Sequence, residues 1–106
     1  MNRLQLSEET LNAVLKFRDD RGWSPFHNPK DLAVSISIEA AELIECFQWS
    51  GASTDPTSDI EHVKEEIADV LIYTLYLADR LGVDLDRTVK AKLEKNAIKY
   101  PLKDDK

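Results

Sequence analysis

Hydrophobic residues recur at i, i+3 and i+4 along four segments of the chain, and residues that start or end helices separate these segments. Such spacing places the apolar side chains on one side of a helix. The pattern therefore predicts an all-α fold with helices at about residues 7–21, 29–49, 60–81 and 84–100. No alternating pattern typical of a β-strand competes with this assignment.

Local signals at the segment boundaries support the four helices. Ser7, Asn28 and Asp84 are each placed to cap the first turn of a helix. Ser58, with a glutamate three residues later, forms a capping box for the third helix, unless Asp55 starts that helix one turn earlier. Glycines follow the first and third helices, where they commonly end a helix.

Carboxylates interrupt the apolar faces of the second and third helices. At ~100° per residue, the main apolar residues of the second helix project within roughly 80° of Glu39, so this glutamate lies inside the buried stripe, with Glu42 at its edge. In the third helix, Asp69 lies in a nearly all-apolar run, and Glu66 precedes it by three residues. Each helix thus presents a carboxylate pair at i and i+3.

Two such pairs facing each other point to a metal site. A buried carboxylate without a partner is unfavourable, and carboxylates brought together repel each other unless cations lie between them. Hard oxygen ligands suit Mg²⁺ or Mn²⁺. In the alternative interpretation, Glu42 and Glu66 are solvated while Glu39 and Asp69 pair with Lys or Arg of another helix. Two matching pairs inside apolar runs favour the metal site.

The loop before the second helix, WSPFHNP, is neither periodic nor simply polar. Trp23, Phe26 and His27 are close enough in sequence to stack on a planar ligand and to hydrogen-bond its base or sugar. Alternatively, the two large aromatic residues plug one end of the helical bundle and His27 caps a backbone group.

Composition narrows the classes of function. A chain of 106 residues with 42% hydrophobic content suits one domain, expected over residues 1–106 with its core at about 7–101. The net charge of −6 makes a role in wrapping nucleic acid improbable on electrostatic grounds. We expect a cytoplasmic protein, because we find neither a signal segment nor a membrane-spanning apolar run. Cys46 is expected in the core.

The third helix is apolar on more sides than a small domain can cover. Besides its main face, Ile72, Leu75 and Tyr76 are apolar. We therefore predict a homo-oligomer in which this helix and part of the second face another subunit.

Four blocks of residues resemble a known family, the all-α nucleoside triphosphate pyrophosphohydrolases of the MazG type, and within it most closely the dCTP pyrophosphatase branch. The family signature is a pair of E-x-x-E and E-x-x-D helices, here 39–42 and 66–69. The resemblance also includes WSPFHNPKDL at 23–32, FQW at 47–49, EEIADVLIY at 65–73 and KLEKNAIKYP at 92–101.

The resemblance implies a fold, a reaction and a set of site residues. The fold is a four-helix MazG-type unit that assembles into a helical-bundle homo-oligomer, a tetramer or a dimer. The implied reaction is Mg²⁺-dependent hydrolysis of a nucleoside triphosphate, such as dCTP or a modified dCTP, to the monophosphate and pyrophosphate, which cleans the nucleotide pool. Glu39, Glu42, Glu66 and Asp69 would be the catalytic metal ligands. The implied substrate-binding residues are Trp23, His27, Trp49, Tyr73, Lys92 and Asn96, the last two acting across a subunit boundary.

Two other classes compete with the enzyme. A helical interaction module would use the acidic face to bind a basic partner, and that face should then be exposed to solvent. A di-iron carboxylate bundle is disfavoured, because the E-x-x-H pairs that it needs are absent from the sequence.

Overall fold

A computed structural model describes residues 2–49, 51, 53–57 and 59–103, and every regular element in these ranges is helical. The four expected helices are α1 (Glu8–Asp20), α2 (Pro29–Glu45), α3 (Ile60–Leu81) and α4 (Leu85–Lys99), with a short 3-10 helix at Ser24–Phe26 between α1 and α2. The prediction of an all-α fold with four helices is confirmed. None of the helices described is long and apolar enough to cross a bilayer.

Side-chain caps start the four α-helices, as the sequence indicates. Ser7, Asn28, Asp59 and Asp84 each accept a hydrogen bond from the backbone N–H three residues later. For α3 the cap is Asp59, whereas the sequence pattern favoured Ser58 or Asp55. Ser58 itself lies outside the described residues. At the other end of α3, Gly82 has φ +66°, the left-handed conformation that a glycine adopts without strain.

α2 ends at Glu45, four residues before the predicted end at Trp49. Residues 46–49 form turns, and Trp49 itself has φ +68°. The backbone N–H and the hydroxyl of Thr57 both donate to the carbonyl of Cys46, at 2.6 and 3.1 Å, and the hydroxyl also donates to the carbonyl of Gln48 at 2.7 Å. The loop after α2 thus supplies hydrogen bonds to carbonyls near the end of this helix, where partners within the helix are lacking.

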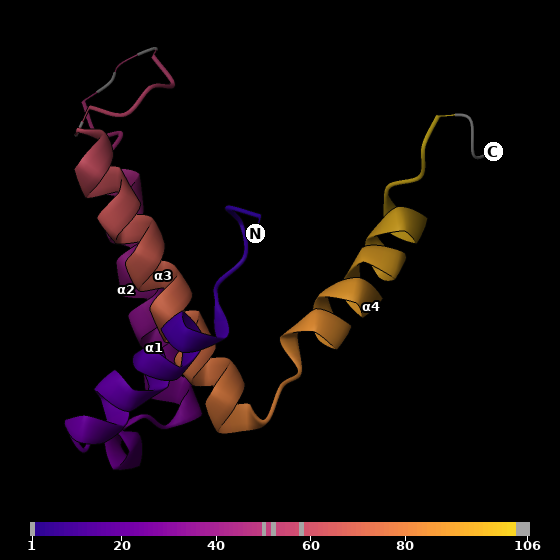
Figure 1. The fold of residues 1–106 in the computed structure, drawn as a ribbon. Coiled ribbons are helices and arrows are strands. Elements are labelled where there is room, and N and C mark those ends of the chain that lie inside the picture. The colour runs from indigo at the N-terminus through magenta and orange to yellow at the C-terminus, as the bar shows by residue number, and fades with distance from the viewer. Residues whose placement is uncertain (1, 50, 52, 58, 104–106) are drawn as a thin grey trace.

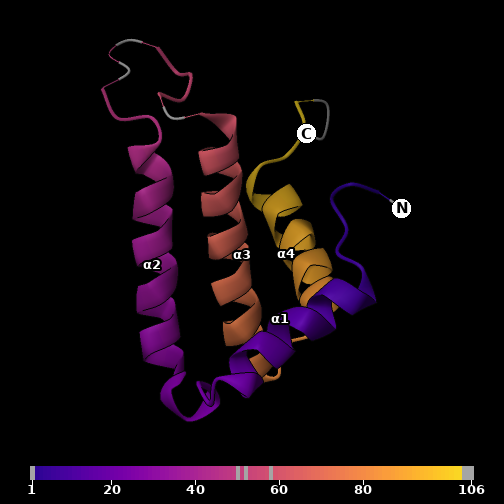
Figure 2. The ribbon, with the colours of Figure 1, turned by 60° about the vertical axis from the view of Figure 1, so that its left-hand side comes forward.

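α2 and α3 lie side by side along most of their length and form the main helix pair (Figure 2). Leu32 and Cys46, both 1% exposed, and Val63 are buried in this pair, so the core position predicted for Cys46 is confirmed. α1 crosses the C-terminal part of α3. The hydroxyl of Tyr76 in α3 donates to the carbonyl of Val14 in α1 at 3.0 Å.

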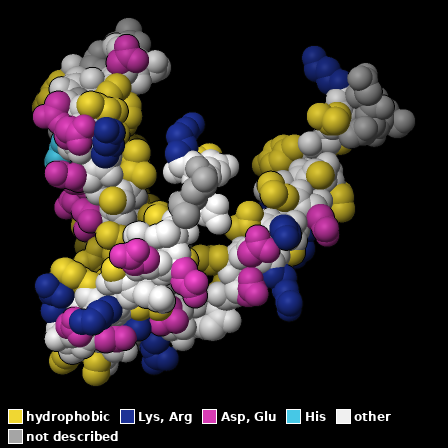
Figure 3. All heavy atoms as spheres, in the orientation of Figure 1, with side chains coloured by type: hydrophobic (Ala, Val, Ile, Leu, Met, Phe, Trp, Pro, Cys, Tyr) yellow, Lys and Arg dark blue, Asp and Glu magenta, His cyan; other side chains and the backbone are white. Residues whose placement is uncertain are grey.

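α4 extends away from the other helices and has no buried residue (Figure 1). Leu85, Val89 and Leu93 recur at every fourth position and form an apolar stripe on this helix, yet they are 37, 53 and 60% exposed. The Cα radius of gyration is 16.9 Å, whereas a compact chain of this length has about 13 Å. Apolar side chains also lie at the surface of α2 and α3 (Figure 3). A single copy therefore leaves much apolar surface uncovered.

Candidate metal centre and aromatic pocket

Carboxylates from α2 and α3 converge where the two helices face each other. Glu39 and Glu42 lie one turn apart on α2, and Glu66 lies on α3. One carboxylate oxygen from each of the three lies within 4.8 Å of the others. The spacing at i and i+3 brings the two α2 side chains to one face, and helix packing brings Glu66 to them. We call Glu39, Glu42 and Glu66 the carboxylate trio.

The trio is partly shielded from water, and no Lys or Arg of the described residues pairs with it. Glu66 is 7% exposed, although the sequence analysis allowed it to be solvated, and Glu39 and Glu42 are half-buried. Oε2 of Glu39 and Oε2 of Glu66 are buried without a hydrogen-bond partner. Among the ion pairs of the described ranges, none joins a Lys or Arg to the trio or to Asp69. The alternative of internal pairing with Lys or Arg is therefore wrong for a single copy.

Burial and the nearby carboxylates disfavour ionisation of Glu39 and Glu66. Burial is the main cause that raises the pKa of Glu39 to about 7, followed by its contact with Glu42 and by the charges of Asp69 and Glu66. The pKa of Glu66 is also raised, first by burial and then by Glu42 and Asp69, while His62 acts in the opposite direction. Among the neighbouring carboxylates, Glu42 thus contributes most to the raised pKa of both Glu39 and Glu66.

This donor set fits a hard divalent cation. Among the described residues, no donor reaches the buried Oε2 atoms of Glu39 and Glu66, and ionised carboxylates offer no proton to each other. A cation between the helices would satisfy these oxygens and offset the repulsion. Asp69, the fourth predicted ligand, is half-buried and is not one of the trio. Its charge nevertheless contributes to the raised pKa of both Glu39 and Glu66.

The raised pKa of Glu39 predicts that the metal-free protein loses stability as pH rises. Between the unfolded pKa of about 4.5 and the folded pKa of about 7, the unfolded state releases a proton that the folded state keeps, so the free energy of unfolding falls across this window. We expect the melting temperature in EDTA to fall between pH 5 and pH 7, and less so in Glu39→Gln. Calorimetric scans of both proteins check this, and equal slopes would contradict it.

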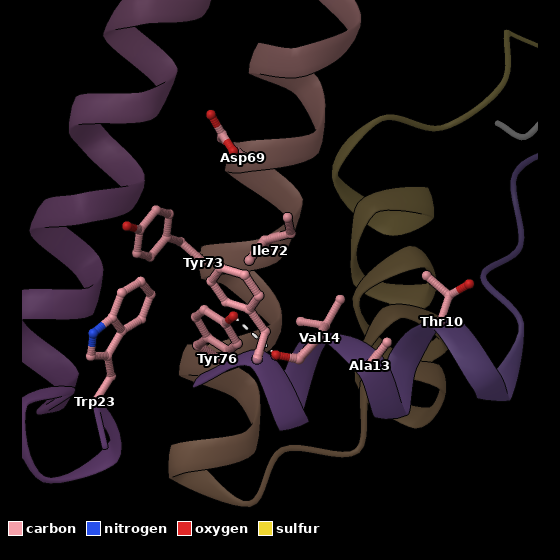
Figure 4. Close-up of a pocket in the computed structure, with 9 residues that line it drawn as sticks. Thr10, Ala13, Val14, Trp23, Asp69, Ile72, Tyr73 and Tyr76 are labelled. Carbon is pink, nitrogen blue, oxygen red and sulfur yellow. Dashed lines mark hydrogen bonds between the residues drawn. The ribbon is translucent and has the colours of Figure 1, made fainter. Parts of the chain in front are cut away.

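A cavity of about 370 Å³ adjoins the acidic cluster and is lined mainly by aromatic and aliphatic side chains (Figure 4). Trp23 and Tyr73, two of the predicted substrate-binding residues, line it, and so does Asp69. The remaining lining residues are Thr10, Ala13, Val14, Phe17, Ile72 and Tyr76. Asp69 therefore connects the carboxylates with the aromatic pocket.

His27 lies beside this pocket, in contact with two of its rings. The centre of its imidazole is 5.9 Å from that of the Trp23 ring and 5.3 Å from that of Tyr76. Burial and the positive charge of Arg18 lower the pKa of His27, so the ring is neutral at pH 7. Its Nδ1 is buried without a hydrogen-bond partner. Among the described residues, Nδ1 of His27 therefore caps no backbone group, contrary to the alternative interpretation of this histidine.

Two residues that support the pocket were not singled out from the sequence for this role. Tyr76 is 2% exposed, and the guanidinium of Arg18 lies 5.6 Å from its ring centre. Arg18, itself buried, pairs with Asp19 at 2.9 Å and with Asp79 at 2.8 Å. The apolar position of Tyr76 three residues after Tyr73 was the available signal, whereas the pairing of Arg18 with Asp79 had none.

Three predicted substrate-binding residues lie away from the pocket within one copy. Trp49 is 89% exposed beyond the end of α2. Because α2 has 17 residues, it separates Trp49 from Trp23 by roughly 25 Å. Lys92 is exposed on α4 and lines a separate groove with Arg87 and Lys95, and Asn96 is half-buried on the same helix. One chain alone does not bring these residues to the trio.

Comparison with known proteins places these features in a family. The model of the MazG-like family matches residues 34–106. Mouse dCTP pyrophosphatase 1 is 37% identical over 100 residues, which cover 90% of this chain and 59% of the mouse protein. The human protein of the same name is 36% identical over 99 residues, with coverages of 89% and 58%. This chain thus spans less than two thirds of these relatives.

A solved structure is similar to this chain over most of its length. The crystal structure of a pyrophosphatase from Archaeoglobus fulgidus superposes with a TM-score of 0.75 at 50% identity, covering 90% of this chain and 92% of that one. The family model matches well over half of the sequence, including both pairs of acidic residues. The chain therefore belongs to the MazG-like family.

Proposed function

We propose that this protein is a divalent-metal-dependent nucleoside triphosphate pyrophosphohydrolase. Water would hydrolyse the bond between the α and β phosphates, giving the nucleoside monophosphate and pyrophosphate. The observation that carries the proposal is the carboxylate trio, which two helices hold together beside an aromatic cavity and which pairs with no Lys or Arg of the described ranges. The names of the mammalian relatives and of the Archaeoglobus protein support the same reaction class.

The carboxylates would bind the cation at the phosphate end of the site. Glu39, Glu42, Glu66 and Asp69 would hold Mg²⁺, with Mn²⁺ as a chemically similar substitute. When bound, the cation supplies positive charge to the phosphate oxygens and lowers the pKa of water that attacks phosphorus. Because Asp69 also lines the cavity, the triphosphate would lie near Asp69 and the base deeper among the rings.

The cavity suits a nucleobase. Its volume of about 370 Å³ lies within the range of small-molecule sites, which is about 300–1,000 Å³. Trp23 and Tyr73 offer aromatic faces for stacking. The unpartnered Nδ1 of His27 would hydrogen-bond the base or sugar. The mammalian relatives are named for dCTP, so we propose dCTP or a modified dCTP as the substrate.

Other copies of the chain would complete the site. Trp49, Lys92 and Asn96 lie too far from the cavity to act within one copy, yet the polyanionic substrate needs cations and the apolar stripe of α4 needs cover. A homo-oligomer, either a dimer or a tetramer, would meet both needs. In such an assembly α4 of one copy would bring Lys92 to the phosphates bound by another.

An interaction module with an acidic docking face has less support. A docking face should be exposed, whereas Glu66 is 7% exposed and Glu39 and Glu42 are half-buried. A basic partner helix would also have to enter the groove between α2 and α3, which pack directly against each other.

Analysis of reaction products tests the proposed reaction. Purified protein incubated with dCTP, 5-methyl-dCTP and the other nucleoside triphosphates should release monophosphate and pyrophosphate in equal amounts with Mg²⁺, and none in EDTA. Chromatography of the nucleotides and a pyrophosphate assay measure both products. Release of single phosphates would contradict cleavage between the α and β phosphates. No turnover with any nucleotide would shift support to the interaction module.

A further inference from the structure

His62 lies one helical turn before Glu66 and faces the candidate metal centre from α3. Its Nε2 is 3.9 Å from Oε1 of Glu66, and its Nδ1 is 3.9 Å from Oε2 of Glu65. Throughout ranges 2–49 and 59–103, no other basic side chain approaches a carboxylate of the trio within 4 Å. From the sequence alone His62 was interpreted as a surface residue, and half of its side chain is exposed.

The backbone fixes His62 in this position. Its N–H donates to Oδ1 of Asp59, the cap of α3, at 2.9 Å, which anchors the first turn of the helix. Residues four apart on a helix share one face, so the imidazole stays next to the Glu66 side chain. Glu66, in turn, is held against α2 with 9% of its side chain exposed, and its Oε2 has no partner.

We propose that His62 is a positioning residue that orients Glu66 through a hydrogen bond from Nε2 to Oε1. The separation of 3.9 Å is longer than a direct hydrogen bond, and a small rotation of the half-exposed imidazole closes it. Oxygens of metal-binding carboxylates that do not face the metal are commonly held by such neighbouring donors. The proposal rests on the cation site proposed above and assigns to this site a residue from outside the acidic motif.

The arrangement favours positioning over direct metal binding. Ligand atoms of Glu39, Glu42 and Glu66 lie within 4.8 Å of one another, whereas the nitrogens of His62 are not part of this group. His62 contacts the trio through Glu66 alone. It therefore acts on the cation by holding one of its ligands.

Calorimetric titration of the metal-free protein tests this without reference to turnover. Mn²⁺ and Mg²⁺ are titrated separately into wild type, His62→Ala, His62→Gln and Lys64→Ala. We expect His62→Ala to weaken both metals by about 10-fold, the lower end of the effect of such neighbouring donors. His62→Gln should restore most of the affinity, because its amide can donate across the same turn. Lys64→Ala is the matched control, because Lys64 is exposed on the same helix and pairs with Glu61.

The outcomes separate this proposal from the proposed function. If wild type binds Mn²⁺ and His62→Ala binds it equally well, the positioning role is wrong and the cation site stands. If His62→Ala loses Mn²⁺ affinity but keeps Mg²⁺ affinity, His62 is a direct nitrogen ligand and the positioning role is again wrong. If wild type binds neither metal, both the cation site and the role of His62 are overturned.

Discussion

Replacing Glu42 by glutamine is expected to reduce turnover by more than about 100-fold while leaving the protein folded. After burial, Glu42 is the main cause of the raised pKa of both Glu39 and Glu66. The glutamine keeps the size of the side chain but removes the negative charge that a cation needs. It also relieves repulsion, so the metal-free variant should melt at the same temperature as wild type or higher. Steady-state kinetics with Mg²⁺ and thermal melting in EDTA measure the two effects.

Glu61→Gln is the matched control for this prediction. It makes the same chemical change on α3, but the Glu61 side chain is 75% exposed and pairs with Lys64. Its turnover should stay within about twofold of wild type. Near wild-type turnover in Glu42→Gln would show that the carboxylate trio is not the catalytic metal centre. A lower melting temperature in EDTA would show instead that Glu42 stabilises the fold.

Helix positions were predictable from the sequence because they depend on local chemistry. Capping by Ser7, Asn28 and Asp84 acts over three residues, and the structure shows each of these bonds. The end of α2 was placed four residues too late, in a region where Thr57 binds the carbonyl of Cys46 from 11 residues away. A contact between residues so far apart in sequence leaves no mark on the local helical pattern.

The candidate site was predictable to a similar extent. Two carboxylate pairs inside apolar runs indicated a cluster, and Glu39, Glu42 and Glu66 do converge. The degree to which each carboxylate is buried was harder to predict, because it depends on how far α2 and α3 are rotated toward each other. Thus Glu66, which the alternative interpretation left solvated, is the most buried of the trio. The contact of Tyr76 with Arg18 links residues nearly 60 positions apart, for which one sequence holds no signal.

Introducing aspartate at Leu93 is expected to dissociate the proposed oligomer and to abolish most activity. Leu93 is 60% exposed in the single copy, so the substitution removes little packing within the chain. In an interface, burying leucine contributes about 1.5–3 kcal/mol, and a two-fold axis would present the change twice. Association should therefore weaken by at least about 100-fold. Light scattering coupled to size-exclusion chromatography measures the mass, and product release measures the activity.

Ala91→Asp is the control for Leu93→Asp, because it adds the same charge to α4. At about 100° per residue, Ala91 lies on the side of α4 opposite the stripe of Leu85, Val89 and Leu93. The control should keep the mass of wild type. A Leu93→Asp protein that stayed oligomeric would show that the stripe of α4 is not the interface.

A wild-type protein that was monomeric and fully active would contradict the proposal that other copies complete the site. Trp49 and Lys92 reach no common site within one copy. Those two residues would then have no part in binding the substrate, and Trp23, Tyr73 and His27 would bind the base without them.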